Sequence, residues 1–422
     1  MLAEFDSLPK PAVFKLSTAP VLRVLEKLGR PQDRLPPVIH IAGTNGKGST
    51  TAFMRAIAEA HGLKVHVDTS PHLIRVNERI RVAGELISDA DLRRHVRAVL
   101  DANAGEPLSF FEGMTIASFL AFAETPADLT LVEVGLGGRF DSTNVFDKPA
   151  ASVITPIAFD HKDLLGHNLC QIAWEKAGVI KAGCPVISAE QDGEIERTLR
   201  AEATYRGAPF TKLSDVMRME KDPYATLTFQ TNGLFVDKIK TGLMGKHQCQ
   251  NAALAVQALS TAGVFKLQPD MVRTGLANAS WPARLQILKP GPLVTASGNK
   301  TVILDGGHNP HAASAICTAL KERAPVPIIC AMLGTKDSES FMREIAPIAE
   351  RLIAIPLPGA KKSQTPETLV KAASKYGIPA ETSSGLDQAV EIAKSSKQKT
   401  LLICGSLYLA GDVLKANGEV IT

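Results

Sequence analysis

The stretch 38–50, Val-Ile-His-Ile-Ala-Gly-Thr-Asn-Gly-Lys-Gly-Ser-Thr, has residue types and a spacing suited to holding a nucleotide phosphate. An apolar run leads into a loop framed by Gly43 and Gly46, and Lys47 and Ser49 follow where an apolar helical pattern begins. Glycine lets the backbone fold closely around an anion, and the start of a helix offers free N–H groups and the positive end of its dipole. The lysine adds a charge and the serine a hydroxyl group. The stretch therefore predicts a phosphate-binding loop.

The spacing of this loop differs from the common GxxxxGK[ST] pattern. That pattern would need glycine at Ile41 and a hydroxyl group directly after the lysine, where this chain has Gly48. The alternative interpretation is a glycine-rich turn without a ligand. We favour the phosphate site, because strand, loop and helix follow one another in the order that it requires.

A second motif, Leu131-Val-Glu-Val-Gly-Leu-Gly-Gly-Arg139-Phe-Asp141-Ser-Thr-Asn144, places a carboxylate, Glu133, inside an apolar strand. An unpaired carboxylate is costly to bury, so it requires a metal ion, a cation or a proton. At the carboxyl end of a parallel sheet beside a phosphate loop, Mg²⁺ is the natural partner. A structural ion pair with a nearby arginine is the alternative.

Two further groups of polar residues follow predicted strands. His161, in the pair Asp160-His161, could ligate a metal, although a lone histidine at such a place is more often a core or loop residue. Lys176, on a helix farther along, would by itself be interpreted as a solvated lysine. Asp305 and His308 lie in a glycine-containing loop that is expected to face a cleft, and they lack the further ligands that zinc would need.

The composition describes an ordinary globular protein. The chain has 422 residues, 45% of them hydrophobic and 21% charged, which predicts at least two domains. The net charge of +4 is too weak and too dispersed for nucleic-acid binding. The six scattered cysteines predict reduced thiols. A targeting peptide and a membrane-spanning run are not recognisable, so we expect no membrane association and a cytoplasmic location.

Short apolar strands alternate with helical patterns, which is typical of an α/β fold with a mainly parallel sheet. In the first part of the chain we predict strands at 38–42, 64–67, 129–134, 152–155 and 185–188, and helices that include 112–123, 172–179, 247–259 and 271–279.

The organisation changes twice along the chain. Residues 219–244 alternate around Asn232-Gly233, which predicts a β-hairpin. Prolines and glycines within 281–292 interrupt every periodic pattern and mark a boundary. We therefore expect a P-loop domain at 1–285 with a mainly parallel sheet, a smaller Rossmann-like α/β domain at 293–422, and a ligand cleft between them. The second domain is predicted to contain strands at 302–304, 328–332, 352–355 and 401–404.

In their order along the chain, these motifs resemble those of the folylpolyglutamate synthase/dihydrofolate synthase family, within the Mur ligase superfamily. The resemblance extends from about residue 13 to residue 411, nearly the whole chain. It rests on Gly43-Thr-Asn-Gly-Lys-Gly-Ser49, Glu133-Val-Gly-Leu-Gly-Gly, Asp160-His161, Glu175-Lys176-Ala-Gly178, His247-Gln248 with Asn251, Trp281-Pro282 with Arg284, Asp305-Gly-Gly-His-Asn-Pro310 and Gly405-Ser406.

The resemblance implies an enzyme that uses ATP to join L-glutamate to a carboxylate of a pterin compound. The carboxylate is first converted to an acyl phosphate, and the glutamate amine then displaces phosphate. Such a transfer needs positive charge and positioning more than covalent help from the protein. The acceptor is expected to be dihydropteroate, a reduced folate, or both. The implied cofactors are ATP and Mg²⁺ at two sites, with a monovalent cation as a further candidate, and we expect a monomer.

The resemblance also implies a role for each matching residue. Catalysis would involve Lys47, Lys176 and His308. ATP would be bound by Asn45, Gly46, Lys47, Gly48, Ser49, Asn251, Arg284 and Asp305. The metal ligands would be Ser70, Glu133, His161 and Lys176. The pterin would be held by Ser109, Phe111, Phe140, Asp141 and Ser142, with His308 and Ser406 serving the incoming glutamate.

The family resemblance reverses the interpretation of Lys176. The matching lysine of the family is found carbamylated by CO₂, which turns a cation into an anionic oxygen ligand. A free lysine has a pKa of about 10.4 and must be neutral to react, so burial and nearby Mg²⁺ should help.

The chain departs from the family pattern at several places. The segment Phe14-Lys-Leu-Ser-Thr-Ala-Pro-Val21 replaces a usual Gly-Leu-Glu-Arg stretch, so no pterin contact is assigned to it. Ala283 and Gly307 replace a usual glycine and alanine, and Thr335-Lys-Asp337-Ser-Glu is a weakened form of a Lys-Asp-Lys-Asp loop. None of these changes removes an implied metal or phosphate ligand.

Two other functions fit part of the pattern. A Mur-type ligase acting on a UDP-muramoyl peptide would share the mechanism, but the surroundings of Phe111-Glu112 and Asp160-His161 resemble the folate enzymes more. A P-loop NTPase switch or motor would not need the second loop at Asp305 and His308, and a motor should show a basic stripe that this chain lacks.

Overall fold

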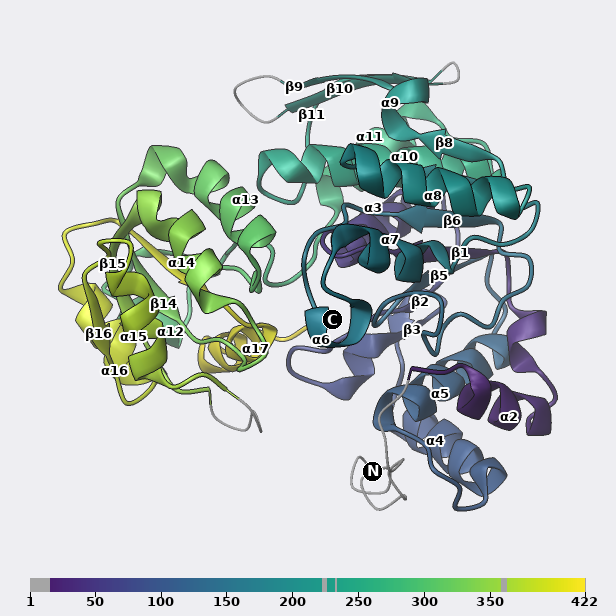
Figure 1. Ribbon diagram of the computed structural model, residues 1–422, viewed down its shortest axis with the longest axis horizontal. Coiled ribbons are helices and arrows are strands. Elements are labelled where there is room, and N and C mark those ends of the chain that lie inside the picture. Colours follow the sequence, from purple (N-terminus) through teal and green to yellow (C-terminus); the bar gives the residue numbers. More distant parts are fainter. Residues whose placement is uncertain (1–15, 222–225, 232–233, 358–362, 422) are drawn as a thin grey trace.

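The protein is described by a computed structural model for residues 16–221, 226–231, 234–357 and 363–421. Over these residues the mixed α/β fold with parallel-dominated sheets is confirmed (Figure 1). The larger sheet has the strand order β4-β3-β2-β5-β1-β6-β7-β8, and only β3 and β4 at one edge are antiparallel to their neighbours. Its strands are β1 (Val38–Ala42), β2 (Val65–Asp68), β3 (Ile80–Val82), β4 (Glu85–Leu86), β5 (Leu129–Glu133), β6 (Ala151–Ile154), β7 (Val186–Ser188) and β8 (Phe210–Lys212).

Helices cover both faces of this sheet. Along β1, Ile39 and Ile41 point to the face covered by α3, α10 and α11, whereas Val38 points to the face covered by α2, α4 and α5. Helices α7 and α8 continue that second face over β6 and β7. The helices of this part are α2 (Ala19–Lys27), α3 (Lys47–Ala60), α4 (Asp89–Asn103), α5 (Phe110–Glu124), α6 (Lys162–Leu165), α7 (Leu169–Ala177), α8 (Gly193–Tyr205), α9 (Leu213–Val216), α10 (Lys246–Ala262) and α11 (Pro269–Asn278).

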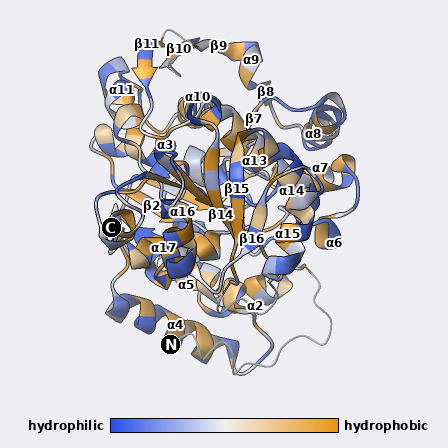
Figure 2. Ribbon diagram, turned by 90° about the vertical axis from the view of Figure 1, so that its left-hand side faces the viewer, coloured by the Kyte–Doolittle hydropathy of each residue, from blue (hydrophilic) through white to orange (hydrophobic). Residues whose placement is uncertain are grey.

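The C-terminal part forms a second sheet with the strand order β12-β13-β17-β14-β15-β16. All neighbours are parallel except β12 and β13, and β14, in the interior of the sheet, is strongly hydrophobic (Figure 2). One face packs against α13, α14 and α15, and the other against α12, α16 and α17. The elements are β12 (Gln286–Ile287), α12 (Pro292–Ala296), β13 (Thr301–Leu304), α13 (Pro310–Leu320), β14 (Val326–Cys330), α14 (Ser338–Ile345), β15 (Ala349–Ala354), α15 (Pro366–Ser374), β16 (Ala380–Thr382), α16 (Leu386–Lys394), β17 (Thr400–Cys404) and α17 (Leu407–Ala416).

The predicted hairpin is present as β10 (Thr226–Thr231) and β11 (Leu234–Lys240), which pair antiparallel. A third strand, β9 (Arg218–Lys221), pairs with β10 and completes a small sheet. The predicted Asn232-Gly233 turn lies outside the described residues. Helical 3₁₀ turns occur at η1 (Pro31–Arg34), η2 (Val76–Arg79), η3 (Lys321–Arg323) and η4 (Ala346–Ile348).

Each predicted strand has a counterpart, and 38–42 matches β1 residue for residue. The strand predicted at 64–67 begins and ends one residue later. The strands β3, β4, β8, β12 and β16 were not predicted, because two or three residues are too few to show a periodic pattern. The larger sheet ends before residue 285 and the second begins at Gln286, while the domain division at 1–285 and 293–422 stays a prediction.

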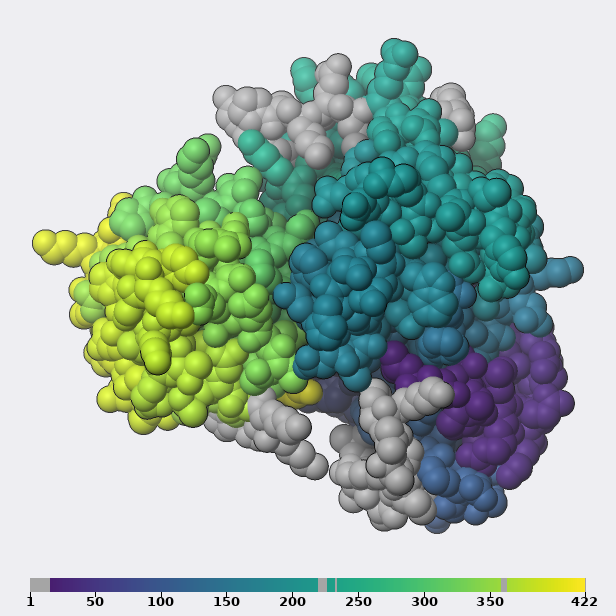
Figure 3. All heavy atoms as spheres, in the orientation of Figure 1, coloured from purple at the N-terminus to yellow at the C-terminus, as the bar shows by residue number. Residues whose placement is uncertain are grey.

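The carboxyl ends of the parallel strands create the place for a ligand site. Ile41 of β1 pairs with Glu133 of β5, so the phosphate-type loop and the buried carboxylate emerge side by side. In the space-filling view the C-terminal lobe, green and yellow, lies against the teal part of the first lobe (Figure 3). Among the described residues, every helix is too short or too polar to cross a membrane.

Candidate active site at the junction of the two lobes

The loop after β1 has the backbone of a tight anion cradle. Gly43 and Gly46 adopt φ values of 145° and 91°, which favour glycine. A side chain at Gly43 would collide with Thr155 at the end of β6, and one at Gly46 would lie 2.6 Å from Oδ1 of Asn251 on α10. The loop is therefore pressed between its neighbours, and its shape depends on having no side chains at these two positions.

The unusual glycine after the lysine also has a structural cause. Gly48 lies in the first turn of α3, where a Cβ atom would come within 2.8 Å of the indole Nε1 of Trp281. The tryptophan belongs to the predicted boundary segment, so the connection between the two lobes occupies the space that a Ser or Thr would need. Ser49 is the buried hydroxyl residue that follows.

Glu133 is a buried carboxylate with spare bonding capacity. It is 6% exposed, and its Oε2 atom has no hydrogen-bond partner. Its Oε1 atom lies 4.0 Å from Nζ of Lys47, so the ion pair that forms is with the loop lysine rather than with an arginine. Burial raises the pKa of Glu133, and the charge of Lys47 opposes this. An orphaned carboxylate oxygen at this edge fits a divalent metal ion, which prefers oxygen ligands.

The burial of Lys176 contradicts its interpretation as a solvated helix lysine. It is 4% exposed, and its Nζ donates to the carbonyl oxygen of Gly43 at 2.8 Å. Burial, followed by the nearby charge of Lys47, lowers the pKa of Lys176 to about 7. A large fraction of this lysine is therefore neutral near pH 7, which is the form that reacts with CO₂. Over the described residues, no three His, Cys, Asp or Glu side chains form a metal-binding group by themselves.

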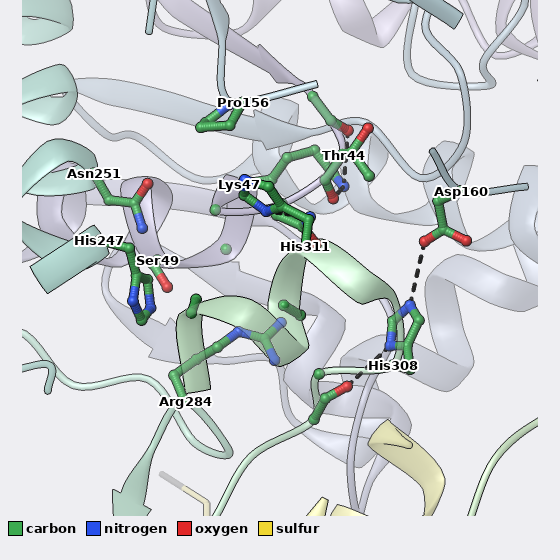
Figure 4. Close-up of a pocket in the computed structure, with 18 of the residues that line it drawn as sticks. Thr44, Lys47, Ser49, Pro156, Asp160, His247, Asn251, Arg284, His308 and His311 are labelled. Atoms are coloured by element: carbon green, nitrogen blue, oxygen red, sulfur yellow. Dashed lines mark hydrogen bonds and ion pairs between the residues drawn. The ribbon is translucent and has the colours of Figure 1, made fainter. Parts of the chain in front are cut away.

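Asp160 connects the two lobes. Its Oδ1 accepts from Nζ of Lys336 at 2.6 Å, and its Oδ2 accepts from Nδ2 of Asn309 at 3.3 Å. The same Oδ2 lies 3.4 Å from Nε2 of His308 (Figure 4). Burial raises the pKa of Asp160, but the contacts with His308 and the charge of Lys336 outweigh burial and hold the pKa well below its usual range.

Two histidines, His308 and His161, lie beside Asp160. Nδ1 of His308 faces the carbonyl oxygen of Gly306 at 2.9 Å, and its other nitrogen faces the Asp160 carboxylate, so both ring nitrogens face acceptors. Burial lowers the pKa of His161 to about 4, which keeps its imidazole neutral. A neutral imidazole is the form that ligates metals.

A pocket of about 420 Å³ contains the residues expected to bind nucleotide and metal. Figure 4 shows Lys47, Ser49 and Asn251 from the first lobe and Arg284, His308 and His311 from the second around one space. Asp305 is buried, and its carboxylate accepts from the backbone N–H groups of Leu285 and Gly307. The predicted residues in its wall are Asn45, Gly46, Lys47, Gly48, Ser49, Ser70, Glu133, His161, Lys176, Asn251, Arg284, Asp305 and His308.

An adjoining pocket of about 360 Å³ contains the residues expected to bind the pterin. Phe111 and Phe140 give it an aromatic wall, and Phe140 is 41% exposed. Ser109 lines it too, although its hydroxyl also caps α5 by accepting from the backbone N–H of Glu112. The predicted residues in its wall are Ser70, Ser109, Phe111, Phe140, Asp141, Ser142, His161, His308 and Ser406. Ser70, His161 and His308 thus line both pockets.

Several site residues were not predicted from the sequence. Lys336 and Arg79 both line the second pocket, and Lys336 is the partner of Asp160 across the junction. Lys336 lies in the loop recognised as a departure from the family pattern, and Arg79 lies after β2 in the same segment as Ser70, so both had a weak signal. Asn309 and His311 bind the side chain of Asn45, which only the meeting of the two lobes reveals.

Comparison with known proteins agrees with this geometry. The Mur ligase middle domain model matches residues 41–259, and the Mur ligase, glutamate ligase domain model matches residues 284–407. The dihydrofolate synthase/folylpolyglutamate synthase of Bacillus subtilis is 34% identical over 415 residues, with 93% of each chain covered.

Solved structures give the same result. The Escherichia coli FolC protein in complex with DHPP and ADP has a TM-score of 0.87 at 29% identity, covering 98% of this chain and 96% of that one. A bifunctional folylpolyglutamate synthase/dihydrofolate synthase with Mn, AMPPNP and L-glutamate bound has a TM-score of 0.86 at 27% identity, with 98% and 96% covered. On this evidence the chain belongs to the folylpolyglutamate synthase/dihydrofolate synthase family of Mur ligases.

Proposed function

We propose that this protein is an ATP-dependent ligase that adds L-glutamate to a pteridine carboxylate, dihydropteroate or a reduced folate, through an acyl phosphate. The observation that carries the proposal is the pair of adjoining pockets with a shared wall of Ser70, His161 and His308. One pocket has a phosphate loop and the other an aromatic wall. A phosphoryl donor and a pteridine acceptor could therefore meet at the shared wall.

The phosphate end of the site belongs to the first lobe. Lys47 and the backbone N–H groups that follow Asn45 would hold the β- and γ-phosphates. The Lys47 ammonium group makes only long contacts with the carbonyl oxygens of Gly43 and Thr44, at 3.3 and 3.5 Å, and phosphate oxygens would replace these. A bound divalent metal would neutralise the charge of the transferred phosphoryl group. Residues proposed to hold it are Ser70, Glu133, His161 and a carbamylated Lys176. Relatives hold Mn or ADP at their sites, and Mg²⁺ at two sites with a monovalent cation stays a prediction here.

The glutamate end would use two basic side chains of the second lobe, Lys336 and His308. Lys336 and His308 line the second pocket and are held by one carboxylate, Asp160. A lysine ammonium group and an imidazole held at fixed positions suit the carboxylate groups of an incoming L-glutamate. Ser406 lines the same pocket and is proposed as a further contact. Arg284 and Asp305, at the start of the second lobe, are proposed to contact ATP together with Asn251.

The proposal is tested by phosphate release that depends on both Mg·ATP and L-glutamate, with separate acceptors. Dihydropteroate, tetrahydrofolate and a UDP-muramoyl peptide are compared. Turnover with both pteridines indicates a bifunctional enzyme, and turnover with tetrahydrofolate alone indicates a dedicated polyglutamate synthase. Turnover with the muramoyl peptide alone would replace the folate assignment by the Mur-type one. The Lys47→Ala variant, which lacks the loop charge, should release almost no phosphate. Cytoplasmic location and the monomeric state stay predictions from the sequence.

A further inference from the structure

His40 is a buried histidine for which the proposed reaction has no use. It lies on β1, two residues before the end of the strand, and is completely inaccessible to solvent. Its ring packs edge-on against Phe146 with centroids 5.8 Å apart. A histidine that only fills a core would be replaceable by an apolar ring, so its hydrogen bonds decide whether it has another role.

A chain of hydrogen bonds leads from His40 to the second pocket. Nε2 of His40 lies 2.9 Å from Oγ1 of Thr143, and that hydroxyl donates to Oδ1 of Asp141 at 2.5 Å. Thr143 also donates its backbone N–H to Oδ1 at 3.0 Å, and Oδ2 accepts from the backbone N–H of Leu136 at 2.8 Å. All of these Asp141 contacts are therefore acceptor contacts. Burial raises the pKa of Asp141, and the hydrogen bonds from Thr143 and Leu136 oppose that rise by favouring the ionised carboxylate.

With Asp141 ionised, the proton count in this chain has one solution. A threonine hydroxyl has a single hydrogen, and in this chain it is donated to Asp141. Oγ1 of Thr143 can then only accept from His40, so Nε2 of His40 must carry hydrogen. Nδ1 of His40 is buried without a partner, which fits a neutral ring protonated at Nε2 only. Burial lowers the pKa of His40 to about 3, so the ring remains neutral over the physiological range.

We infer that His40 and Thr143 are positioning residues that orient Asp141 and the loop around it for the pteridine acceptor. This inference rests on the proposed function, because it gives the second pocket its substrate. His40 makes the Thr143 hydroxyl donate in one direction only, and Asp141 then holds the backbone of Leu136. Phe140 and Ser142, the chain neighbours of Asp141, line the same pocket. The strand that leads into the phosphate loop thereby also determines the shape of the acceptor pocket.

Steady-state kinetics with matched variants test the inference. Thr143→Val keeps the shape and removes the hydroxyl, whereas Thr143→Ser keeps the hydroxyl. His40→Phe removes the donor, whereas His40→Gln offers an N–H near the Nε2 position. We expect Thr143→Val and His40→Phe each to raise the KM for the pteridine acceptor about tenfold, with the KM for ATP within about twofold of wild type. Thr143→Ser and His40→Gln should keep a KM for the acceptor close to that of wild type. The double variant His40→Phe/Thr143→Val should have a KM for the acceptor no higher than that of either single variant.

Equal increases in both KM values, or a His40→Gln variant as impaired as His40→Phe, would overturn the inference. Nitrogen-15 NMR of the histidine ring gives a readout that does not depend on turnover. A neutral ring protonated at Nε2 between pH 6 and 8 supports the hydrogen-bond chain, and protonation at Nδ1 contradicts it. If wild type turns over no pteridine acceptor, the proposed function fails, and the ring tautomer still decides whether His40 acts on Asp141 through Thr143.

Discussion

Single buried charges control most of the chemistry that this site offers. The sequence placed Glu133 inside an apolar strand, whereas Lys176 by itself was interpreted as a solvated lysine. Both side chains are buried beside the phosphate loop. Their ordinary charged forms are costly there unless a partner is supplied. The orphaned oxygen of Glu133 and the lowered pKa of Lys176, about 7, both fit the proposed metal site with a carbamylated lysine.

The role of Lys176 can be tested by chemical rescue. Lys176→Ala should lose most activity, because it removes the group that would become an anionic oxygen ligand. Short carboxylic acids together with Mg²⁺ should restore part of the activity, measured as glutamate-dependent phosphate release. The Lys181→Ala variant serves as the control, since Lys181 lies outside both pockets and its activity should not respond to the acids. A fully active Lys176→Ala enzyme would rule out the carbamate.

The neutral state of His40 predicts a pH dependence of stability. The pKa of His40 is about 3 in the folded protein and about 6.5 in the unfolded chain. As the pH falls from 6.5 towards 3, the unfolded chain binds a proton that the folded protein does not. Wild type should therefore lose up to ~1.4 kcal/mol of unfolding free energy per pH unit from this residue.

The measurement compares urea unfolding of wild type and His40→Gln between pH 7 and 4.5. The variant should lose less stability on acidification, because glutamine does not titrate. Other histidines with lowered pKa values, among them His66 and His95, are common to both proteins and cancel in the difference. If the difference in unfolding free energy between wild type and His40→Gln stayed constant over this pH range, His40 would not be protonated selectively in the unfolded chain.

At the scale of one element, the phosphate loop depends on neighbours that are distant in sequence. Gly46 begins α3 with a φ of 91°, and Gly62 follows the end of the same helix with a φ of 82°. A side chain at Gly62 would meet nothing within 4 Å, whereas one at Gly46 would meet Asn251. The two glycines share the backbone requirement and differ in their surroundings.

This difference makes Gly62→Ala a matched control for Gly46→Ala. Both substitutions should lose about 1 kcal/mol of unfolding free energy to left-handed backbone strain. Only Gly46→Ala should also displace Asn251 and distort the phosphate loop. We therefore expect this variant alone to raise the KM for ATP by about tenfold or more. Thermal unfolding and ATP kinetics measured on both variants separate the two effects. If Gly62→Ala raised the KM for ATP equally, the close contact with Asn251 would not be the cause.

At the scale of the whole molecule, the contact between the lobes includes a buried ion pair. The side chains of Lys336 and Asp160 are 6% and 11% exposed, and their charged atoms lie 2.6 Å apart. Removing one partner of a buried pair leaves an uncompensated charge, which costs about 3–5 kcal/mol. Exposed pairs contribute about 0–1 kcal/mol.

We therefore expect Lys336→Met to lower the unfolding free energy by about 3 kcal/mol, and the double variant Asp160→Asn/Lys336→Met to recover part of it. Lys375→Met is the control, because it breaks a pair with Glu339 whose side chains are 49% and 53% exposed. Its effect should stay below about 1 kcal/mol. Urea denaturation of the four proteins gives the comparison, and equal losses in the two lysine variants would contradict a buried bridge between the lobes.

The sequence by itself determined the local features of this protein. The strand at 38–42, the glycine loop after it and the helix from Lys47 could be predicted because each depends on residues adjacent in the chain. The family, the fold class and the two groups of pocket residues followed from the order of such motifs. The tertiary structure decided what lies beside each group: Trp281 against Gly48, Lys336 against Asp160, and Thr143 between His40 and Asp141. Burial, pKa and proton position depend on these distant neighbours, because desolvation and hydrogen bonding act through space rather than along the chain.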